Sequence, residues 1–522
     1  MFASGRQLKR YQHEDLEKLL ARENGLYTAA RGPIIAYPTG LGKTPLMIAI
    51  VTSTMKSAAG PTLIIVPSGG VLQQWKSECK AFAPGLKISV QHPLFDAVRG
   101  TNLYEPAGPH YPLFCISWNR VILDEAHNIR NYETKRAKAC FTMVEKARYA
   151  ACLTATPAQN SFRDFYSYFK FLNITDYGLH NWGNFNAQIV LPLLAENSDP
   201  DPATALLTEV LLRHVIWQPK DLISLPSLQT HTVNVTLTPA ERGLYRYIQS
   251  LRLGRSSYVQ FTRERQVCDH GALVRMEVKP SELLLDGYDS DVEEPTTEDD
   301  LDGISSSMAA LGVDKSSKGE TEDPWQPVSE DGVRKWAFLL QETYRSSKMC
   351  TAIKILKEIR QRSGNEKTIV FSHFKEPLSI LHGFLKEEGF SCVSYTGMMT
   401  IAERGEALSK ISHNAKETVI LMSLKSGSDG LNVAACNNVI LLEPWWNPYV
   451  ERQAIGRIHR LGQTRPSHVY RLLTPGTIEM QVRKKQLEKE ASIDLLMGSF
   501  QDLKMEDMEE MLRATRDDTT DV

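Results

Sequence analysis

A glycine-rich loop at residues 37–44 has the residue types and spacing of a phosphate-binding loop. It reads Tyr-Pro-Thr-Gly-Leu-Gly-Lys-Thr and lies between an apolar run and a helical pattern. There, backbone N–H groups and the helix N-terminus can hold phosphate oxygens, Lys43 can neutralise the β and γ phosphates, and the Thr44 hydroxyl can bind Mg²⁺. An accidental turn is the alternative, which the flanking strand and helix disfavour. The predicted nucleotide-binding residues of the loop are Gly40, Leu41, Gly42, Lys43 and Thr44.

Two adjacent carboxylates follow another apolar run. Asp124 and Glu125 come directly after residues 121–123, and open α/β sheets bind ligands at the carboxyl ends of their strands. Asp124 can hold Mg²⁺ through water, while Glu125 can orient and deprotonate an attacking water. An exposed acidic turn is the other interpretation. The phosphate loop upstream, in the correct order, favours the catalytic one.

Two arginines near the C-terminal end could supply positive charge for phosphoryl transfer. Arg457 and Arg460 lie three residues apart, so we expect them on one face of a helix. Their guanidinium groups could stabilise the transferring phosphoryl group as arginine fingers do. A basic surface helix is the alternative. Because these arginines fall in a different lobe from Lys43, hydrolysis would depend on lobe closure, as a motor requires.

The elements that position these residues form two α/β lobes. Short apolar runs alternate with helical patterns, as in a parallel sheet wrapped by helices. The runs are 34–36, 63–66, 121–123 and 150–153 in the first lobe, and 368–371, 392–395, 419–422 and 439–442 in the second. A length of 522 residues also exceeds what one core organises.

The sequence between the lobes is partly helical and partly very acidic. We expect a first lobe at 1–225, a linker at 226–345, a second lobe at 346–500 and an acidic tail at 501–522. The linker combines an alternating segment, a helical protrusion and an acidic insert at about 279–331, whose composition is typical of disorder. Since the net charge is only −2, the chain without insert and tail is basic by about +16, enough for a nucleic-acid groove if the bases cluster.

Composition argues against several other classes. The hydrophobic content is 42%, yet no apolar run approaches the roughly 18 residues of a membrane span. Residues 1–9 do not resemble a secretory signal. The eight cysteines lack any C-x-x-C spacing, which argues against zinc modules and disulfide frameworks. We therefore expect a soluble intracellular protein with reduced thiols.

Longer motifs resemble those of the Swi/Snf family of helicase-like DNA translocases, from Leu8 to about Ile493. The segments that carry the resemblance are 8–12, 66–75, 153–160, 369–374, 423–432, 444–448 and 460–466. The last two are close to signatures of this family that ordinary strand-separating helicases lack. The sequence of residues 112–120 resembles that of the subgroup that contains helicase-like transcription factor and transcription termination factor two. The cysteines of a RING finger, which members of that subgroup often carry, are not found here.

The resemblance implies two RecA-like lobes with parallel sheets, joined by a helical linker with a disordered acidic insertion. It also implies the use of ATP and Mg²⁺, and salt-sensitive contacts to the DNA backbone. The nucleotide contacts that it adds are Gln12, as the adenine contact, Gly430 and Gln453. The DNA contacts that it implies are Pro67, Ser68, Ser372, Ser423 and Lys425.

The chain departs from the family pattern at several positions. Tyr37 and the two residues after it replace acidic residues before the loop glycines, and Ala155 replaces a glycine. Asp429 stands where the family carries a small or apolar residue, and His214 stands where a second arginine is expected. The span from Ser68 to Asp124 is also short for the family.

We therefore expect an ATP hydrolase of the nucleus that translocates along double-stranded DNA and remodels contacts with nucleosomes or other DNA-bound proteins. Neither a membrane nor zinc is an expected partner. The alternative is a degenerate, catalytically weak paralogue that acts as a DNA- or chromatin-binding scaffold. An RNA helicase is a third possibility, which residues 444–448 disfavour.

Overall fold

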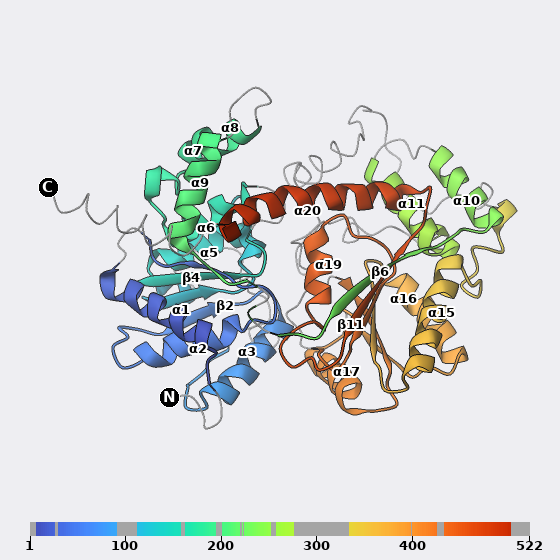
Figure 1. Ribbon diagram of the computed structural model, residues 1–522, viewed down its shortest axis with the longest axis horizontal. Helices are drawn as coiled ribbons and strands as arrows, with labels where there is room; N and C mark the ends of the chain where they lie inside the picture. The colour runs from blue at the N-terminus through green and yellow to red at the C-terminus, as the bar shows by residue number, and fades with distance from the viewer. Residues whose placement is uncertain are drawn as a thin grey trace. The chain divides into compact units, whose positions relative to one another are not determined.

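The chain folds into two compact lobes, which we describe separately (Figure 1). The computed structural model describes residues 7–26, 30–90, 112–157, 162–194, 201–219, 222, 224–251, 257–275, 334–397, 399–424 and 433–502. Among these, the first lobe holds the residues up to Ser224 and those from Lys489, and the second lobe is Leu225–Glu488. The acidic insert, Lys425, Asp429, Gly430 and most of the acidic tail lie outside the described residues.

The first lobe is built on a parallel five-stranded sheet with the order β2-β3-β4-β1-β5. Its strands are β1 (Ile34–Ala36), β2 (Thr62–Ile65), β3 (Arg120–Leu123), β4 (Tyr149–Thr154) and β5 (Val215–Trp217). Its helices are α1 (Arg10–Ala21), α2 (Lys43–Thr54), α3 (Gly69–Phe82), α4 (Pro112–Cys115), α5 (Lys135–Glu145), α6 (Asp164–Leu172), α7 (Trp182–Phe185), α8 (Leu191–Leu194) and α9 (Asp201–His214).

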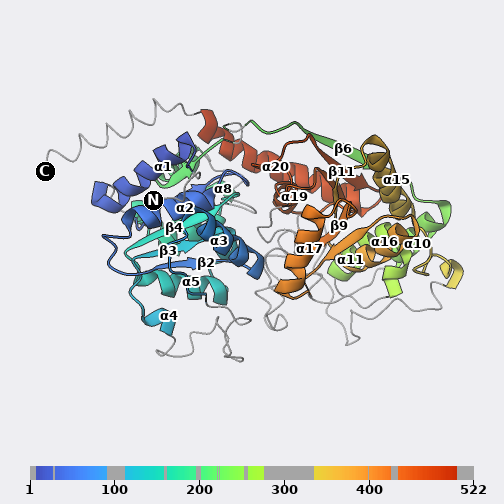
Figure 2. The ribbon, with the colours of Figure 1, turned by 90° about the horizontal axis from the view of Figure 1, so that it is seen from below.

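Both faces of this sheet are covered by helices. Ile35, Ile122 and Leu153 share a hydrophobic core with α1, α2 and α3, because every second residue of a strand points to the same side. Figures 1 and 2 show these three helices on one side of the sheet and α5 on the other. The alternating runs of the sequence predicted this α/β lobe.

The second lobe is a parallel six-stranded sheet with the order β6-β11-β10-β7-β9-β8. Its strands are β6 (Leu228–Asn234), β7 (Thr368–Ser372), β8 (Cys392–Tyr395), β9 (Val419–Ser423), β10 (Asn438–Leu441) and β11 (Ser467–Leu473). Its helices are α10 (Pro239–Ser250), α11 (Ser257–Asp269), α15 (Ser347–Arg362), α16 (Glu376–Glu387), α17 (Ile401–His413), α19 (Pro448–Ile455) and the first part of α20 (Ile478–Asp502).

Two separate hydrophobic cores flank this second sheet. Val370 and Ile440 pack with α15 and α16, whereas Ile369 and Leu441 pack with α17 and α19. Neighbouring residues of one strand therefore feed opposite cores. Strands β7, β9 and β10 are buried on both faces, which explains why they are continuous apolar runs rather than alternating ones. The predicted fold class, two parallel α/β lobes, is confirmed.

The segment expected to be a linker contributes structure to the second lobe. The alternating residues that follow Leu228 form β6, which pairs in parallel with β11 from Leu228–Ser467 to Asn234–Leu473. The helical stretch is α10, which begins at a capping box between Thr238 and Glu241. Helices α10 and α11 share a core of their own. Within the described residues no helix has the length and hydropathy to span a membrane.

One departure from the family pattern has a structural partner in the first lobe. Arg213 Nη1 lies 3.3 Å from Asp176 Oδ1, and His214 Nε2 lies 2.9 Å from Asp176 Oδ2. The His214 hydrogen bond is the largest influence that lowers the pKa of Asp176. His214 thus helps to hold the end of α9 on this carboxylate.

We expect Asp176→Asn to lower the free energy of unfolding by about 1 kcal/mol at pH 7.5, since it removes a partly screened ion pair. A carboxyl whose pKa is lowered by folding stabilises above its unfolded pKa, and that contribution is lost as the pH falls through the folded value. The stability gap between wild type and variant should therefore keep its pH 7.5 value down to the ordinary aspartate range, about pH 4, and narrow as the pH falls further to about 3. Thermal unfolding at these pH values measures it, with Glu14→Gln, in an exposed ion pair, as the control. A gap that does not change with pH would contradict the assignment.

Candidate active site

The phosphate loop lies between β1 and α2, where the sequence predicted it. Gly42 has φ +80° and Gly40 has φ +89°, a backbone region that favours glycine. A Cβ on Gly42 would also lie 2.6 Å from Gln12 Nε2. Lys43 Nζ donates to the Tyr37 carbonyl at 2.9 Å, so the lysine side chain folds back over its own loop. These features fit a loop shaped around phosphate oxygens.

Gln12 lies against this loop. Its Nε2 donates to the Gly42 carbonyl at 2.9 Å and to the Leu41 carbonyl at 3.3 Å, and its Oε1 accepts the Lys9 N–H at 2.8 Å. Both amide donors are therefore directed at the loop. An adenine contact through Nε2 would compete with these bonds, whereas Oε1 retains a free lone pair.

The two carboxylates lie at the carboxyl end of β3. Strand β4 separates β3 from β1 in the sheet, so the acidic motif and the phosphate loop end two nearby parallel strands. Glu125 has φ +47°, an uncommon conformation for a residue other than glycine and one often found at functional sites. Glu125 Oε2 is buried 3.4 Å from His127 Nδ1 and has no hydrogen-bond partner among the described residues. This oxygen is available to accept a proton from water.

Asp124 is held by a residue whose role the sequence did not reveal. The Trp75 indole N–H donates to Asp124 Oδ2 at 2.7 Å, and the Glu125 N–H donates to Asp124 Oδ1 at 2.9 Å. Burial and then the neighbouring Glu125 raise the pKa of Asp124 to about 6, while Trp75 and Lys43 lower it. Trp75 therefore orients the carboxylate and favours its charged form.

A signal for Trp75 was present in the sequence. Val71, Trp75 and Cys79 recur every four residues along the buried face of α3, a spacing that predicts core positions. A buried tryptophan usually needs a partner for its indole N–H. No local pattern, however, indicates that this partner lies 49 residues away.

We expect Trp75→Phe to raise the Mg²⁺ concentration for half-maximal ATPase activity by about 10-fold, the usual effect of losing a group that orients a metal ligand. Phenylalanine keeps an aromatic ring at this position but has no indole N–H, so the hydrogen bond to Asp124 is lost. Trp118→Phe is the matched control, because Trp118 is buried in the same lobe and its indole donates only to the Leu113 carbonyl, at 3.2 Å. Measuring ATP hydrolysis at increasing Mg²⁺ concentration gives this half-maximal concentration for each variant. An equal response of the two variants would exclude a specific role for Trp75.

The two arginines of the second lobe lie beyond a helix rather than on one. Helix α19 ends at Ile455, and Gly456 is its C-cap. Arg457 and Arg460 follow in turns, so the prediction of one helical face was wrong. Glycine has a low helix propensity, which agrees with a helix end at Gly456. Gln463 Nε2 fastens these turns to the Cys436 carbonyl at 2.8 Å.

Gln453 is buried on α19, and its Nε2 has no hydrogen-bond partner among the described residues. Arg457 is also buried, and Arg460 is half-buried. A buried amide donor without a partner is costly, which is consistent with a ligand contact at Gln453. Gly430, the other nucleotide contact expected in this lobe, lies outside the described residues.

Residues 444–448 form a tightly held tryptophan segment. The Trp445 ring stacks on His373 with 3.9 Å between centroids. The backbone N–H of Trp445 donates to Glu451 Oε1 at 2.9 Å, and Arg471 Nη2 donates to the other carboxylate oxygen, Glu451 Oε2, at 2.8 Å. From α11, Arg265 donates to the Pro444 carbonyl at 3.1 Å. The segment therefore connects the helical protrusion with the end of β7.

The expected DNA contacts differ in how far their side chains are already engaged. Ser68 caps α3 and accepts the Val71 N–H. Ser372 is buried and donates to Glu443 Oε1 at 3.0 Å. Ser423 is buried at the end of β9 and Pro67 is half-buried, while Lys425 lies outside the described residues. The hydroxyls of Ser68 and Ser372 thus shape loops, which leaves backbone groups for contact with phosphates.

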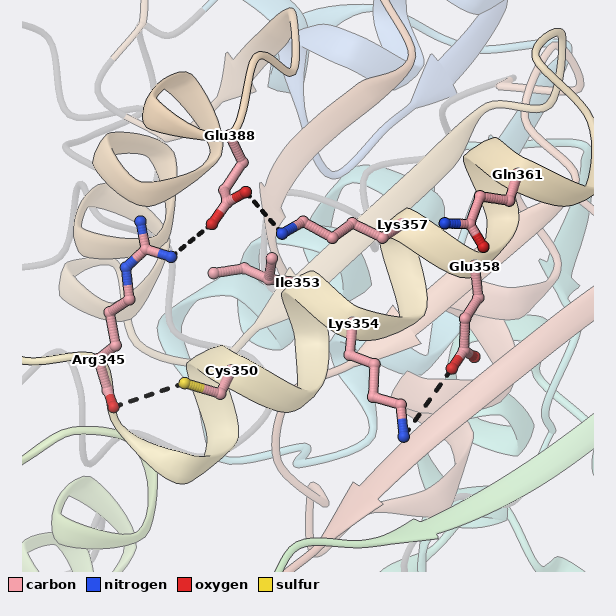
Figure 3. A pocket seen from close by; sticks show the side chains of 8 residues that line it. All are labelled: Arg345, Cys350, Ile353, Lys354, Lys357, Glu358, Gln361 and Glu388. Atoms are coloured by element: carbon pink, nitrogen blue, oxygen red, sulfur yellow. Dashed lines mark hydrogen bonds and ion pairs between the residues drawn. The ribbon is translucent and has the colours of Figure 1, made fainter.

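A surface depression on α15 is separate from these motifs (Figure 3). Its charged side chains are matched to one another. Arg345 and Lys357 both bind Glu388, at 2.5 and 2.6 Å, and Lys354 lies 4.0 Å from Glu358. Figure 3 shows the first two cations converging on this one glutamate. The depression offers neutralised ion pairs rather than a charged ligand site.

Three family models match parts of the chain. Residues 110–276 match the SNF2-related domain, residues 348–462 match the helicase conserved C-terminal domain, and residues 6–95 match the type III restriction enzyme res subunit. Two parallel α/β lobes with these motifs define a helicase-like ATPase.

The relatives narrow this class. An uncharacterized ATP-dependent helicase of Schizosaccharomyces pombe is 26% identical over 94% of this chain and 60% of its own length. DNA repair protein RAD5B of Arabidopsis thaliana is 27% identical over 89% of this chain and 45% of its own length, and helicase-like transcription factor CHR27 of the same plant is 27% identical over 74% and 47%. The chain thus carries an SNF2-related domain and a helicase C-terminal domain, and its relatives are helicases of the Swi/Snf type. It spans about half the length of these relatives.

Among solved structures, the SWI2/SNF2 ATPase core of Sulfolobus solfataricus in complex with dsDNA is 22% identical and covers 96% of both chains, with a TM-score of 0.39.

Proposed function

We propose that this chain is an ATP-driven translocase on double-stranded DNA that remodels protein–DNA contacts in the nucleus. The observation that carries the proposal is the pairing of a phosphate loop with the Trp75-held carboxylate Asp124 at nearby strand ends of one sheet. The names of the relatives, a DNA repair protein and a helicase-like transcription factor, support the DNA substrate and the nuclear setting.

The residues of the first lobe divide the chemistry among them. Backbone N–H groups of the loop and Lys43 would bind the phosphates of ATP. Thr44 and Asp124, which are both buried at the site, would supply the oxygen ligands that Mg²⁺ prefers. Glu125, whose buried Oε2 lies 3.4 Å from His127 Nδ1 and accepts no hydrogen bond from the described residues, would take a proton from the attacking water.

The second lobe would contribute cations and the track for DNA. Arg457 and Arg460 are the proposed stabilisers of charge in the transition state. The rigid tryptophan segment and the loop that begins at Ser372 would guide one DNA strand by its phosphates, so binding should weaken steeply with salt. Such contacts carry little sequence information.

Displacement of a triplex-forming strand from duplex DNA tests translocation directly. The expected result is ATP-dependent release of the third strand without separation of the duplex. The Glu125→Gln variant should bind the same DNA and release nothing. DNA binding without release by the wild type would favour the scaffold alternative. Strand displacement from an RNA duplex, without stimulation by duplex DNA, would favour an RNA helicase.

A further inference from the structure

The phosphate loop begins with a residue that the family pattern does not contain, Tyr37, and its surroundings suggest a role. Tyr37 is 0% exposed, and its hydroxyl donates to Asp15 Oδ2 on α1. Burial, and after it the neighbouring Asp15, raises the pKa of Tyr37 far above its ordinary value. The phenol therefore remains a hydrogen-bond donor at every physiological pH.

Asp15 gathers several donors in the interior of the lobe. It is also 0% exposed. Besides Tyr37, it accepts Gln218 Nε2 at 2.7 Å on the same oxygen, Oδ2, and Lys18 Nζ at 2.9 Å on Oδ1. A buried carboxylate needs such partners, because unpaired charge is costly away from water. Hydrogen bonds to an ionised group are also stronger than neutral ones.

Helix α1 contacts the phosphate loop at three points. At the start of the loop, Tyr37 binds Asp15. In the middle, the Tyr11 hydroxyl donates to the Leu41 carbonyl at 2.7 Å, and at the end Gln12 donates to the Gly42 carbonyl at 2.9 Å. The three contacting helix residues are all buried. Only the Tyr37 contact involves a charged acceptor, so it is the strongest of the three candidates for fixing the loop.

The same carboxylate oxygen also reaches the last strand of the lobe. Gln218 directly follows β5, which pairs with β1, the strand that leads into the loop. Tyr37 and Gln218 thus share Asp15 Oδ2 from the ends of two neighbouring strands. A shift of the loop would disturb both hydrogen bonds together.

We propose that Asp15 and Tyr37 form a positioning pair that holds the phosphate loop in its nucleotide-binding conformation, at the place where the family carries acidic residues. The inference rests on the proposed ATPase site. In this role, Tyr37 would increase the affinity for nucleotide and would take no part in the chemical step. The pair acts on the loop that cradles the phosphates, so its loss should weaken ground state and transition state alike.

The test measures ADP binding by fluorescence without DNA, and ATP turnover at saturating ATP. Tyr37→Phe is expected to weaken ADP binding and raise KM for ATP by about 10-fold, with kcat within about 2-fold, since one charge-assisted hydrogen bond is lost. Asp15→Asn should weaken binding in the same direction. The double variant should bind ADP as tightly as whichever single variant binds it less well, because both changes remove the same hydrogen bond.

Tyr245→Phe is the matched control. Tyr245 is a buried tyrosine of the second lobe whose hydroxyl donates to buried Glu264 at 2.8 Å. The Tyr245→Phe variant should lose about as much thermal stability as Tyr37→Phe does. Its ADP affinity should stay within about 2-fold of the wild-type value. Unchanged ADP affinity in Tyr37→Phe, or fully additive losses in the double variant, would overturn the positioning pair. Because these readouts need no DNA, a failure of DNA to stimulate turnover would count against the translocase proposal and not against the pair.

Discussion

Replacing Glu125 by glutamine is expected to lower ATP turnover by about 100-fold or more, the usual cost of losing a general base, while ATP binding is retained. The carboxyl is buried 3.4 Å from His127 and has an oxygen without a hydrogen-bond partner among the described residues. Glutamine keeps the shape of this side chain but cannot take a proton from water. Phosphate release in a single turnover measures the chemical step, and binding of a fluorescent ADP analogue measures affinity.

Glu133→Gln is the control for that experiment. Glu133 lies eight residues after Glu125, in the same lobe, and its side chain is exposed. The same carboxyl-to-amide change there should leave turnover within about 2-fold, as expected for a surface substitution. If Glu125→Gln hydrolysed ATP as fast as Glu133→Gln, Glu125 would not be the base.

Lys43→Ala should weaken ATP binding by roughly 10- to 100-fold, because it removes charge-assisted hydrogen bonds to phosphate. Turnover at saturating ATP should fall as well, since negative charge on the phosphates persists in the transition state. In the structure Lys43 Nζ rests on the Tyr37 carbonyl at 2.9 Å, within the loop that it would serve. Titration with the fluorescent ADP analogue gives the affinity.

Lys56→Ala provides the comparison for Lys43. Lys56 is exposed just beyond the end of α2, the helix that Lys43 begins. A loss of one positive charge at that end of the helix should leave ADP affinity within about 2-fold. Equal losses in both variants would mean that general charge, rather than a phosphate contact by Lys43, sets the affinity.

Local patterns predicted most strands and the position of the phosphate loop. The runs at 34–36 and 392–395 coincide with β1 and β8. Strand β1 is buried on both faces and is therefore a continuous apolar segment. Strands β5 and β11 were not predicted. Strand β5 directly follows α9, so no turn residue marks where the strand begins. Strand β6 was predicted only as an alternating segment, because its pairing with β11 joins residues more than 230 positions apart.

The contacts that shape the candidate site are mostly remote in sequence. Trp75 binds Asp124 across 49 residues, and Ser372 binds Glu443 across 71. Periodicity describes which side of an element is buried, but it does not pair one element with another. The resemblance to the family assigned Ser372 to DNA, whereas the structure buries its hydroxyl on Glu443.

Tyr37 illustrates the opposite case, in which the structure explains an unusual residue. In the sequence, Tyr37 was one of the departures from the family pattern that left a degenerate paralogue as the alternative. The buried hydroxyl instead meets Asp15, four residues after Tyr11 on α1. The loop is therefore supported from α1, and the departure from the family pattern does not by itself indicate a degenerate site.

The most direct measurement of the central claim is steady-state ATP hydrolysis with and without double-stranded DNA. We predict that duplex DNA stimulates turnover by about 10-fold or more at low salt, that the stimulation fades as salt displaces the protein from phosphates, and that Glu125→Gln abolishes it. Equal turnover of wild type and Glu125→Gln at every DNA concentration would contradict the assignment of an active, DNA-driven ATPase.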